Sequence, residues 1–273
     1  MTDLYAVIGN PIGHSKSPLI HAMFAQATGQ DMRYVAIEGP LGGFSARVDQ
    51  FRREGGRGLN VTVPFKLDAC AYATDLCEAA RLAGAANAMK FEQGRVFAEN
   101  FDGLGLINDI ERNLGFALAD KRILILGGGG AARGALHPML MKEPALVVIA
   151  NRTVEKARDL AARFSAFGEV VAVDFADLSR LPPFDRVVNA TSASLYQESP
   201  PVPPESFAEG GLAYDMVYGK GLTPFLRIAQ SAPARLADGV GMLVEQAAEA
   251  FAWWRGVRPM TGPVIARLTV PLT

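Results

Sequence analysis

The chain has 273 residues, of which 49% are hydrophobic, enough to build one large domain or two modest ones with full cores. Its 27 basic residues are balanced by 28 acidic ones, leaving a net charge of −1. This balance argues against nucleic acid or an anionic membrane surface as the main partner. We therefore expect a small-molecule partner, no nucleic acid and no membrane.

The N-terminus and the cysteines indicate a cytoplasmic protein. Met1 to Tyr5 enters a strand-like pattern at once, without the basic start and long apolar stretch of a signal peptide. No segment approaches the roughly 18 apolar residues of a membrane span. Cys70 and Cys77 have neither a metal-site spacing nor the count of a disulfide framework, so we expect two reduced thiols. The three histidines are scattered, and we expect no metal site.

The first hundred residues alternate extended runs with helical patterns. A helix is predicted to begin at Ser17, with Ser17 as its N-cap and Pro18 at its first position. A hairpin is predicted to turn at Gln93-Gly94. The remaining predicted elements are strands at Tyr5–Gly9, Arg33–Glu38 and Gly58–Val63, a helix at Leu41–Arg53, and the hairpin strands Ala86–Phe91 and Arg95–Asn100. The alternation predicts an α/β fold, a largely parallel sheet with helices on both faces.

A second α/β unit is predicted to follow. It opens on Arg122–Leu126, an uninterrupted apolar strand of the kind that is buried on both faces. A helix from about Gly130 to Met141 contains Pro138, which could kink it. The later predicted elements are strands at Leu146–Ala150, Val170–Val173, Arg186–Ala190 and Leu212–Val217, helices at Thr153–Phe164 and Val240–Trp254, and a short helix after Pro259.

The glycine run after the strand Arg122–Leu126 has the context of a dinucleotide-binding loop. Gly127 would permit the tight turn, and Gly129 would let the backbone approach a pyrophosphate. Gly130 and Ala131 would open the helix, whose N-terminus offers free N–H groups and the positive end of its dipole. A plain strand-to-helix turn is the alternative for such a glycine run taken alone.

The end of the next strand favours NADP over NAD. A site for NAD places Asp or Glu about 20 residues after the glycines, to bind the ribose 2′-hydroxyl. This chain has Asn151, Arg152 and Thr153 at that point, with Lys156 one turn further. Cations suit a 2′-phosphate, because a guanidinium binds phosphate oxygens in a fork and stacks on the adenine. The alternative is that Arg152 and Lys156 are merely solvated.

Two segments ahead of the glycine run carry residues that can move a proton. They are Asn60–Lys66 and Glu99–Gly103, and in each an extended run gives way to a helical pattern. Oxidation of a secondary alcohol by NADP needs a group to take the hydroxyl proton, and a Lys near a carboxylate can relay it. Lys66 and Asp102 are the candidates; the alternative is a structural ion pair.

A series of motifs extends along the whole chain in a distinctive order. The segments are Gly9–Pro18, Asn60–Lys66, Gly84–Asn87, Tyr214–Tyr218, Thr223–Phe225 and Asp238–Gln246. Together they resemble the shikimate dehydrogenase family. The resemblance implies reversible, NADP-dependent reduction of 3-dehydroshikimate to shikimate in aromatic amino acid biosynthesis. It also implies a substrate domain over residues 1–101 joined by C-terminal helices 239–273, and a Rossmann domain over residues 102–238.

The resemblance also implies the roles of individual residues. Lys66 and Asp102 match the family's proton-transfer pair. Substrate binding is implied for Ser15, Ser17, Asn60, Thr62, Asn87, Phe101, Tyr218 and Gln246. Cofactor binding is implied for the residues already named at the glycine run and the next strand, and for Thr191, Met216 and Gly239. A hydroxyl pair at a helix N-terminus, such as Ser15 and Ser17, is a suitable site for the carboxylate of the substrate.

Two positions depart from the family pattern. Typical members have Asn-Thr-Asp-Gly where this chain has Asn100-Phe101-Asp102-Gly103, and Asn-Thr where it has Asn87-Ala88. A lost hydrogen bond to a ligand costs on the order of 1 kcal/mol, and a phenyl ring could fill part of the pocket. We therefore hypothesise a variant with altered preference, in which Phe101→Thr raises shikimate turnover. The alternative is that Phe101 points into the core.

Three other functions compete with the leading one. The chain could be a quinate/shikimate dehydrogenase, a paralogue acting on a related ring acid, or a catalytically silent sensor of NADP and a ring acid. A sensor has no need of both Lys66 and Asp102, which argues against that class. The sequence leaves monomer and homodimer open.

Overall fold

The computed structural model describes residues 2–273, which form two compact units. Unit 1 contains the described part of Met1–Gly105 and the segment Val244–Val264. Unit 2 contains Leu106–Leu243 and Ile265–Thr273. The sequence placed all of residues 239–273 with the first domain. In the structure only residues 244–264 of this stretch group with unit 1, whereas residues 239–243 and 265–273 group with unit 2.

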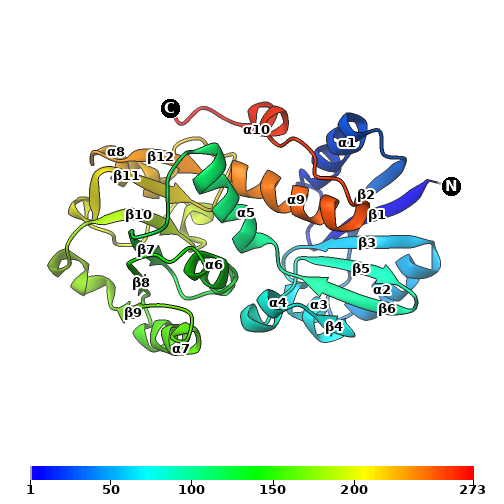
Figure 1. Cartoon of the computed structure of the whole chain (residues 1–273), viewed down its shortest axis with the longest axis horizontal. Coiled ribbons are helices and arrows are strands. Elements are labelled where there is room, and N and C mark those ends of the chain that lie inside the picture. Colours follow the sequence, from blue (N-terminus) through cyan, green and yellow to red (C-terminus); the bar gives the residue numbers. More distant parts are fainter. Residues whose placement is uncertain (1) are drawn as a thin grey trace. The chain divides into compact units, whose positions relative to one another are not determined.

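Unit 1 is built on a six-stranded sheet in the order β2-β1-β3-β5-β6-β4 (Figure 1). Every neighbouring pair is parallel except the pairs made by β5. Gln93 and Gly94 both have positive φ angles, as the two-residue turn of the β5–β6 hairpin requires. The strands are β1 Asp3–Gly9, β2 Met32–Glu38, β3 Gly56–Val61, β4 Asp75–Leu76, β5 Ala88–Glu92 and β6 Arg95–Glu99.

Helices cover both faces of this sheet. One face packs on α2 (Phe44–Arg53), α3 (Lys66–Tyr72) and α4 (Glu78–Ala83), which share a core with Ala6 and Ile8 of β1. The other face packs on α1 (Ser17–Thr28) and α9 (Val240–Arg255), where rings from both helices meet Tyr34 of β2. Adjacent strand residues point to opposite faces, so Tyr5 joins the second cluster.

Trp254 anchors α9 to the sheet. Its indole Nε1 donates to the carbonyl oxygen of Met89 at 3.0 Å. A Cβ atom on Gly58 would lie 2.5 Å from that Nε1. The close approach of helix and strand therefore depends on glycine at position 58, and it fixes the part of α9 that belongs to unit 1.

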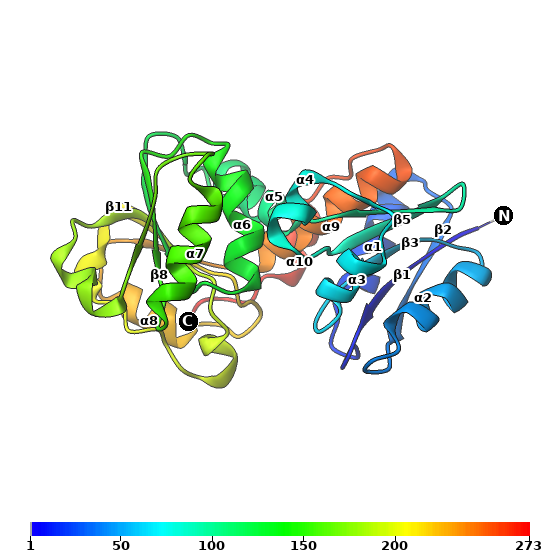
Figure 2. The same cartoon turned by 90° about the horizontal axis from the view of Figure 1, so that it is seen from below.

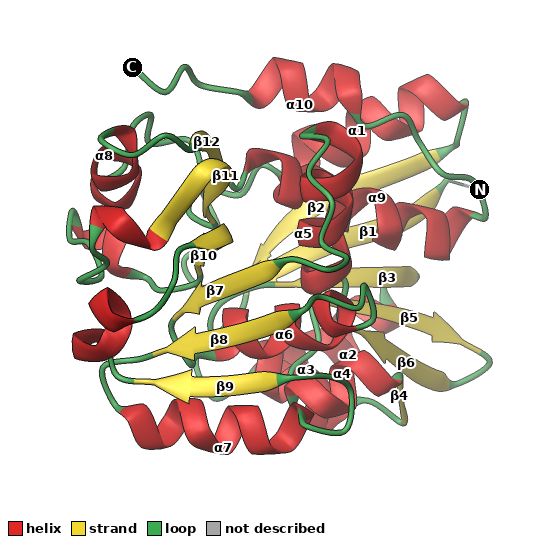
Figure 3. Ribbon diagram, turned by 60° about the vertical axis from the view of Figure 1, so that its left-hand side comes forward, coloured by secondary structure: helices red, strands yellow, loops and turns green. Residues whose placement is uncertain are grey.

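Unit 2 is built on a six-stranded, fully parallel sheet in the order β12-β11-β10-β7-β8-β9. Figure 3 shows β7, β8 and β9 running in the same direction. The order is that of a Rossmann fold, reversing direction at β7. The strands are β7 Arg122–Leu126, β8 Leu146–Ala150, β9 Val170–Val173, β10 Phe184–Asn189, β11 Phe207–Asp215 and β12 Arg235–Asp238.

Helices flank this second sheet too. The helices α6 (Gly130–Leu140) and α7 (Val154–Phe164) lie side by side (Figure 2). On the other side, α8 (Pro224–Gln230) shares a core with Leu124 and Leu126 of β7. Short 3₁₀ turns lie at Phe175–Arg180, Ala193–Tyr196 and Pro204–Ser206, and a last helix, α10, spans Gly262–Leu268. Among residues 2–273, no helix has the length and apolarity to cross a membrane.

Within residues 2–273, three helices contain residues of both units: α5 (Asp102–Asn108), α9 and α10. In unit 2, α5 continues as a π-helical turn that begins at Asp109. The Tyr214 hydroxyl donates to Asp109 Oδ2 at 2.7 Å and accepts from the Met242 N–H at 3.3 Å. A Cβ on Gly241 would lie 1.8 Å from Asp109 Oδ1. The first turn of α9 and the end of α5 are therefore joined through a buried carboxylate.

The α/β prediction is confirmed, and the predicted bounds of β7, β8 and β9 agree with the structure. The strand predicted at Gly58–Val63 instead ends at Val61. The helix predicted from Leu41 begins at Phe44, after a turn in which Gly43 N–H bonds the carbonyl of Pro40. The short elements β4, α3, α4, α8 and β12 had no bounds predicted from the sequence.

We predict that Gly58→Ala lowers the free energy of unfolding by about 1–3 kcal/mol, because the added methyl group overpacks Trp254. Urea unfolding followed by fluorescence measures the effect. Gly262→Ala is the control, since a Cβ there meets no described atom within 4 Å. Equal stability of the two variants would contradict the anchoring role of Trp254.

Candidate active site

Lys66 and Asp102 form a close ion pair in unit 1. Lys66 is the first residue of α3, shortly after β3 ends, and Asp102 is the first residue of α5, shortly after β6 ends. Lys66 Nζ lies 2.5 Å from Asp102 Oδ2. Their side chains are 32% and 17% exposed, so the pair is accessible to a ligand yet shielded from most of the solvent.

Asn87 holds the Asp102 carboxylate from the other side. The side-chain Nδ2 of Asn87 donates to Asp102 Oδ1 at 2.8 Å and to Gln246 Oε1 at 3.2 Å. Its Oδ1 accepts the backbone N–H of Phe101 at 2.8 Å. Asn87 is only 2% exposed, and a buried amide that is hydrogen-bonded at both ends has a fixed orientation. The structure thus brings Lys66, Asn87, Asp102 and Gln246 together.

Asn100 fixes the chain at the start of α5. Its Nδ2 donates to the carbonyl oxygen of Ala85 at 2.9 Å, and its Oδ1 accepts the Asp102 N–H at 3.1 Å. This Asx turn orients Asp102 toward Lys66. The motif residues Ala85, Asn87, Asn100 and Asp102 therefore form one hydrogen-bonded unit.

A second polar group lies around Asn60, which is 5% exposed. Asn60 Nδ2 donates to the backbone carbonyl of Asn87 at 3.3 Å, which connects the two groups. Asn60 Oδ1 accepts the hydroxyl of Tyr34 at 2.7 Å. Ser17 acts on the pKa of Tyr34 in the direction opposite to burial. Tyr34 is not among the site residues predicted from the sequence, because a tyrosine in a strand is an ordinary core residue.

The start of α1 differs from the prediction. Lys16, not Ser17, is the N-cap residue, and α1 begins at Ser17. Ser15 Oγ accepts the Ser17 N–H at 3.3 Å, so the hydroxyl that bonds the helix start belongs to Ser15. Ser17 is buried, and its side chain affects the pKa of Tyr34, the partner of Asn60.

Thr62 and Phe101 lie at the margins of these groups. Thr62 is half-buried in the turn after β3, where its N–H donates to the carbonyl of Ile8 at 2.9 Å. Phe101 contributes its backbone N–H to Asn87, whereas its ring packs edge-to-face against Trp253 with centroids 5.8 Å apart. The phenyl ring thus joins the aromatic cluster that also contains Ala88 and Trp254.

The glycine run lies in unit 2 as the sequence predicted, between β7 and α6. Gly127 has a φ angle of +109°, which strongly favours glycine. A Cβ on Gly129 or Gly130 would meet no described atom within 4 Å, so space is open beside the backbone there. Together with the exposed first turn of α6 at Ala131, this arrangement fits a pyrophosphate.

The segment after β8 meets this loop. Asn151 Oδ1 accepts the N–H of Gly128 at 3.2 Å, and its Nδ2 donates to the carbonyl of Thr153 at 2.8 Å. Asn151 therefore ties the two turns to each other. Arg152, Thr153 and Lys156 are exposed, and within residues 2–273 the structure gives neither cation an ion pair. Both cations are thus available to an anionic ligand.

Thr191, Met216 and Gly239 lie at the ends of neighbouring strands of unit 2. Thr191 donates its hydroxyl to Asn189 Oδ1 at 2.7 Å, and a Cβ on Gly127 would lie 3.0 Å from Thr191 Cγ2. A Cβ on Gly239 would lie 2.3 Å from the carbonyl oxygen of Met216, so these two residues are in direct contact. Tyr218 follows β11 and is 37% exposed; it belongs to unit 2, unlike the other substrate-binding candidates.

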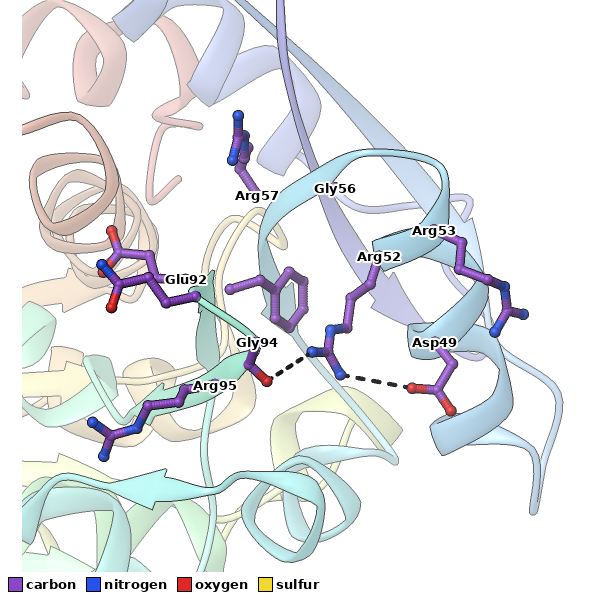
Figure 4. A pocket seen from close by; sticks show the side chains of 10 residues that line it. Asp49, Arg52, Arg53, Gly56, Arg57, Glu92, Gly94 and Arg95 are labelled. Carbon is purple, nitrogen blue, oxygen red and sulfur yellow. Dashed lines mark hydrogen bonds and ion pairs between the residues drawn. The ribbon is translucent and has the colours of Figure 1, made fainter.

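A surface pocket of about 450 Å³ lies at a different place in unit 1. It includes Gly56 at the start of β3 and Gly94 at the hairpin turn, whereas Asn60 lies near the opposite end of β3. Figure 4 shows Arg52 turned toward Gly94 and Asp49, while Arg53, Arg57 and Arg95 point in different directions. The arginines do not converge on one point. The residues that line the pocket include none of those around Lys66 or Asn60, so this pocket is separate from the site above.

Family profiles cover most of the chain. Residues 7–89 match the shikimate dehydrogenase substrate binding domain, residues 109–198 match shikimate / quinate 5-dehydrogenase, and residues 239–269 match the shikimate 5'-dehydrogenase C-terminal domain. A protein from Nitrosospira multiformis named shikimate dehydrogenase (NADP(+)) is 57% identical over 269 residues, which are 98% of each chain.

Solved structures agree with these matches. An Ael1 enzyme from Pseudomonas putida is 57% identical, with a TM-score of 0.96 over 100% of both chains. Shikimate 5-dehydrogenase from Thermus thermophilus, in complex with NADP(H) and shikimate, is 32% identical, with a TM-score of 0.86 over 97% of this chain and 98% of that one. From its sequence, its fold and the residues around Lys66, the chain belongs to the shikimate dehydrogenase family.

Proposed function

We propose that this chain is an NADP-dependent shikimate dehydrogenase in which Lys66 and Asp102 transfer the proton. The observation that carries the proposal is the 2.5 Å contact between Lys66 Nζ and Asp102 Oδ2 in a half-shielded position. The activity follows from the family and from relatives that are named shikimate dehydrogenase (NADP(+)). The predicted preference for NADP over NAD agrees with those names.

Lys66 is the group that meets the reacting oxygen of the substrate. When bound, NADP accepts the hydride from the alcohol carbon, or NADPH delivers it to the ketone carbon. In the oxidising direction the Lys66–Asp102 pair takes the hydroxyl proton; in the reducing direction it returns a proton to the oxygen. Asn87 and Asn100 keep the carboxylate in place throughout, so little reorganisation accompanies the step.

The remaining polar groups of unit 1 suit a polyhydroxylated ring acid. Ser15 and Ser17 lie at the N-terminus of the 12-residue helix α1, which favours a carboxylate. Asn60, Thr62, Asn87 and Gln246 supply amide and hydroxyl groups for the ring hydroxyls. Tyr218 is the one substrate-binding candidate from unit 2.

Unit 2 fits the cofactor. The glycine run leaves open space beside Gly129 and Gly130 for the pyrophosphate. Arg152 and Lys156 would hold the 2′-phosphate, because both are exposed cations next to a turn that Asn151 fixes. Met216 and Gly239, which touch each other, would line the nicotinamide site, and Thr191 would lie near the glycine run.

Packing explains the two positions, Ala88 and Phe101, at which the chain departs from the family pattern. Ala88 is fully buried, and Phe101 packs on Trp253 in the same aromatic cluster. The phenyl ring is thus accounted for by contacts with α9. This favours the core alternative over our sequence-based hypothesis that the ring narrows the substrate pocket.

Initial rates with shikimate and quinate, each with NADP and NAD, test the function. NADP-linked shikimate oxidation is the expected result. Turnover of quinate at a comparable rate would favour the quinate/shikimate alternative, and NADP binding without turnover would favour a paralogue or a sensor. The cytoplasmic location and the choice between monomer and homodimer stay predictions.

Lys66→Ala should lower kcat by about 10²–10⁴-fold, because the proton loses its carrier. The NADP dissociation constant should stay within twofold of wild type, since Lys66 belongs to unit 1. Lys90→Ala is the control: Lys90 is also an ion-paired lysine of unit 1, bonded to Glu92 at 2.7 Å. Unchanged kcat in Lys66→Ala would remove Lys66 from the mechanism.

Arg152→Ala should raise the NADP dissociation constant by about 10–100-fold, the range of a lost charge-assisted hydrogen bond, and leave that of NAD within about twofold. Isothermal titration with both cofactors measures the difference. Arg158→Ala serves as control, because Arg158 is an exposed arginine of α7 that pairs with Glu155. Equal weakening of both cofactors would show that Arg152 does not bind the 2′-phosphate.

Phe101→Thr should lower the free energy of unfolding by about 1–2 kcal/mol, less than for a fully buried phenylalanine because Phe101 is half-buried. With the ring turned toward Trp253, kcat/KM for shikimate should change little. Phe97→Thr removes another half-buried ring of unit 1 and provides the comparison. A rise in kcat/KM in Phe101→Thr alone would restore the pocket-narrowing hypothesis.

A further inference from the structure

We infer that Tyr34 is a positioning residue of the substrate pocket, which sets the direction in which the Asn60 amide faces the substrate. The inference rests on the proposed function, in which Asn60 contacts a ring hydroxyl. It concerns a residue that lies outside every motif singled out in the sequence, in the middle of β2.

The contacts of Asn60 determine which end of its amide is free. The Tyr34 hydroxyl lies 2.7 Å from Asn60 Oδ1. Burial raises the pKa of Tyr34 well above its usual value, so the phenol keeps its proton and acts as the donor. Asn60 Nδ2 uses one hydrogen on the carbonyl of Asn87, at 3.3 Å. The second hydrogen on Nδ2 is therefore the group that Asn60 offers to a ligand.

Packing keeps the Tyr34 hydroxyl in this place. The ring of Tyr34 stacks on His21 of α1, with centroids 4.1 Å apart and an interplanar angle of 6°. Trp254 lies on another side at 6.4 Å, and the strand register of β1 and β2 places Tyr34 opposite Tyr5. The ring is thus held between two helices and the sheet, while its hydroxyl bonds Asn60 Oδ1.

Loss of the hydroxyl would free the amide of Asn60. Without the donor at Oδ1, the amide is oriented only by its longer contact, the 3.3 Å hydrogen bond from Nδ2 to the Asn87 carbonyl. The amide is then held less firmly toward the substrate hydroxyl. A buried polar group that loses its partner also weakens the whole chain of hydrogen bonds. The substrate would then bind more weakly, whereas proton transfer at Lys66, which Asn87 and Asp102 control, would proceed as before.

Tyr34→Phe tests the inference, because it removes the hydroxyl and keeps the ring. We expect the KM for shikimate to rise about 5–20-fold, the range of one lost hydrogen bond. The kcat and the KM for NADP should stay within about twofold. Tyr5→Phe is the matched control: its ring stacks on Trp254 in the same cluster, but its hydroxyl meets Arg255 at 3.4 Å. The same rise in Tyr5→Phe would overturn the inference.

A double-mutant cycle separates positioning from a general structural effect. If Tyr34 acts through Asn60, the variant Asn60→Ala and the double variant Tyr34→Phe/Asn60→Ala should have the same KM for shikimate within about twofold. Effects that multiply would show that Tyr34 acts independently of Asn60 and would overturn the inference.

Titration calorimetry with shikimate on the wild type distinguishes failure of the inference from failure of the proposed function. If the wild type binds and oxidises shikimate while Tyr34→Phe is unchanged, only the positioning role is wrong. If the wild type neither binds nor oxidises shikimate, the proposed function is wrong and the role of Tyr34 falls with it. Binding without turnover lets the same comparison be made on dissociation constants.

Discussion

The side-chain amide of Asn87 is the interaction on which the geometry of unit 1 depends. It joins the start of α5, through Asp102 and the Phe101 N–H, to α9, through Gln246, which is 159 residues away in sequence. Because Asn87 is buried, loss of any one of these partners leaves a polar atom without compensation. All three hydrogen bonds of the amide form only when the start of α5 and the helix α9 are both in place beside Asn87. The amide thereby holds Asp102 beside Lys66.

The functional residues of each unit lie beyond the carboxyl ends of strands that run in the same direction. In unit 1, Lys66 follows β3 and Asp102 follows β6; in unit 2, the glycine run follows β7 and Arg152 follows β8. Open parallel sheets present their ligand sites at the carboxyl ends of strands, since successive helices there diverge from the sheet. The pocket at the other end of β3 is lined by charged side chains, but its arginines do not converge on one point.

The sequence predicted the bounds of β7, β8 and the edge strand β9 as the structure has them. Arg122–Leu126 and Leu146–Ala150 are buried on both faces, so their apolar runs coincide with the strands. Shorter elements such as β4 and α4 have too few residues for a clear period. The predicted N-cap of α1 was wrong, because Ser15 and Ser17 lie two positions apart and each is a typical N-cap residue. Tyr34 could not be predicted as a site residue, since its role comes from a contact with Asn60 across the sheet.

At Phe101 the backbone and the side chain make two separate contacts, one with Asn87 and one with Trp253. Asn87 is bonded by the Phe101 N–H, which any residue other than proline supplies, while the phenyl ring makes its contact with Trp253. Mutations at position 101 can therefore be accepted during evolution without breaking the hydrogen bonds around Asp102. A hydroxyl and a ring at this position leave the same N–H for Asn87 to accept, and they differ only in what they offer to α9.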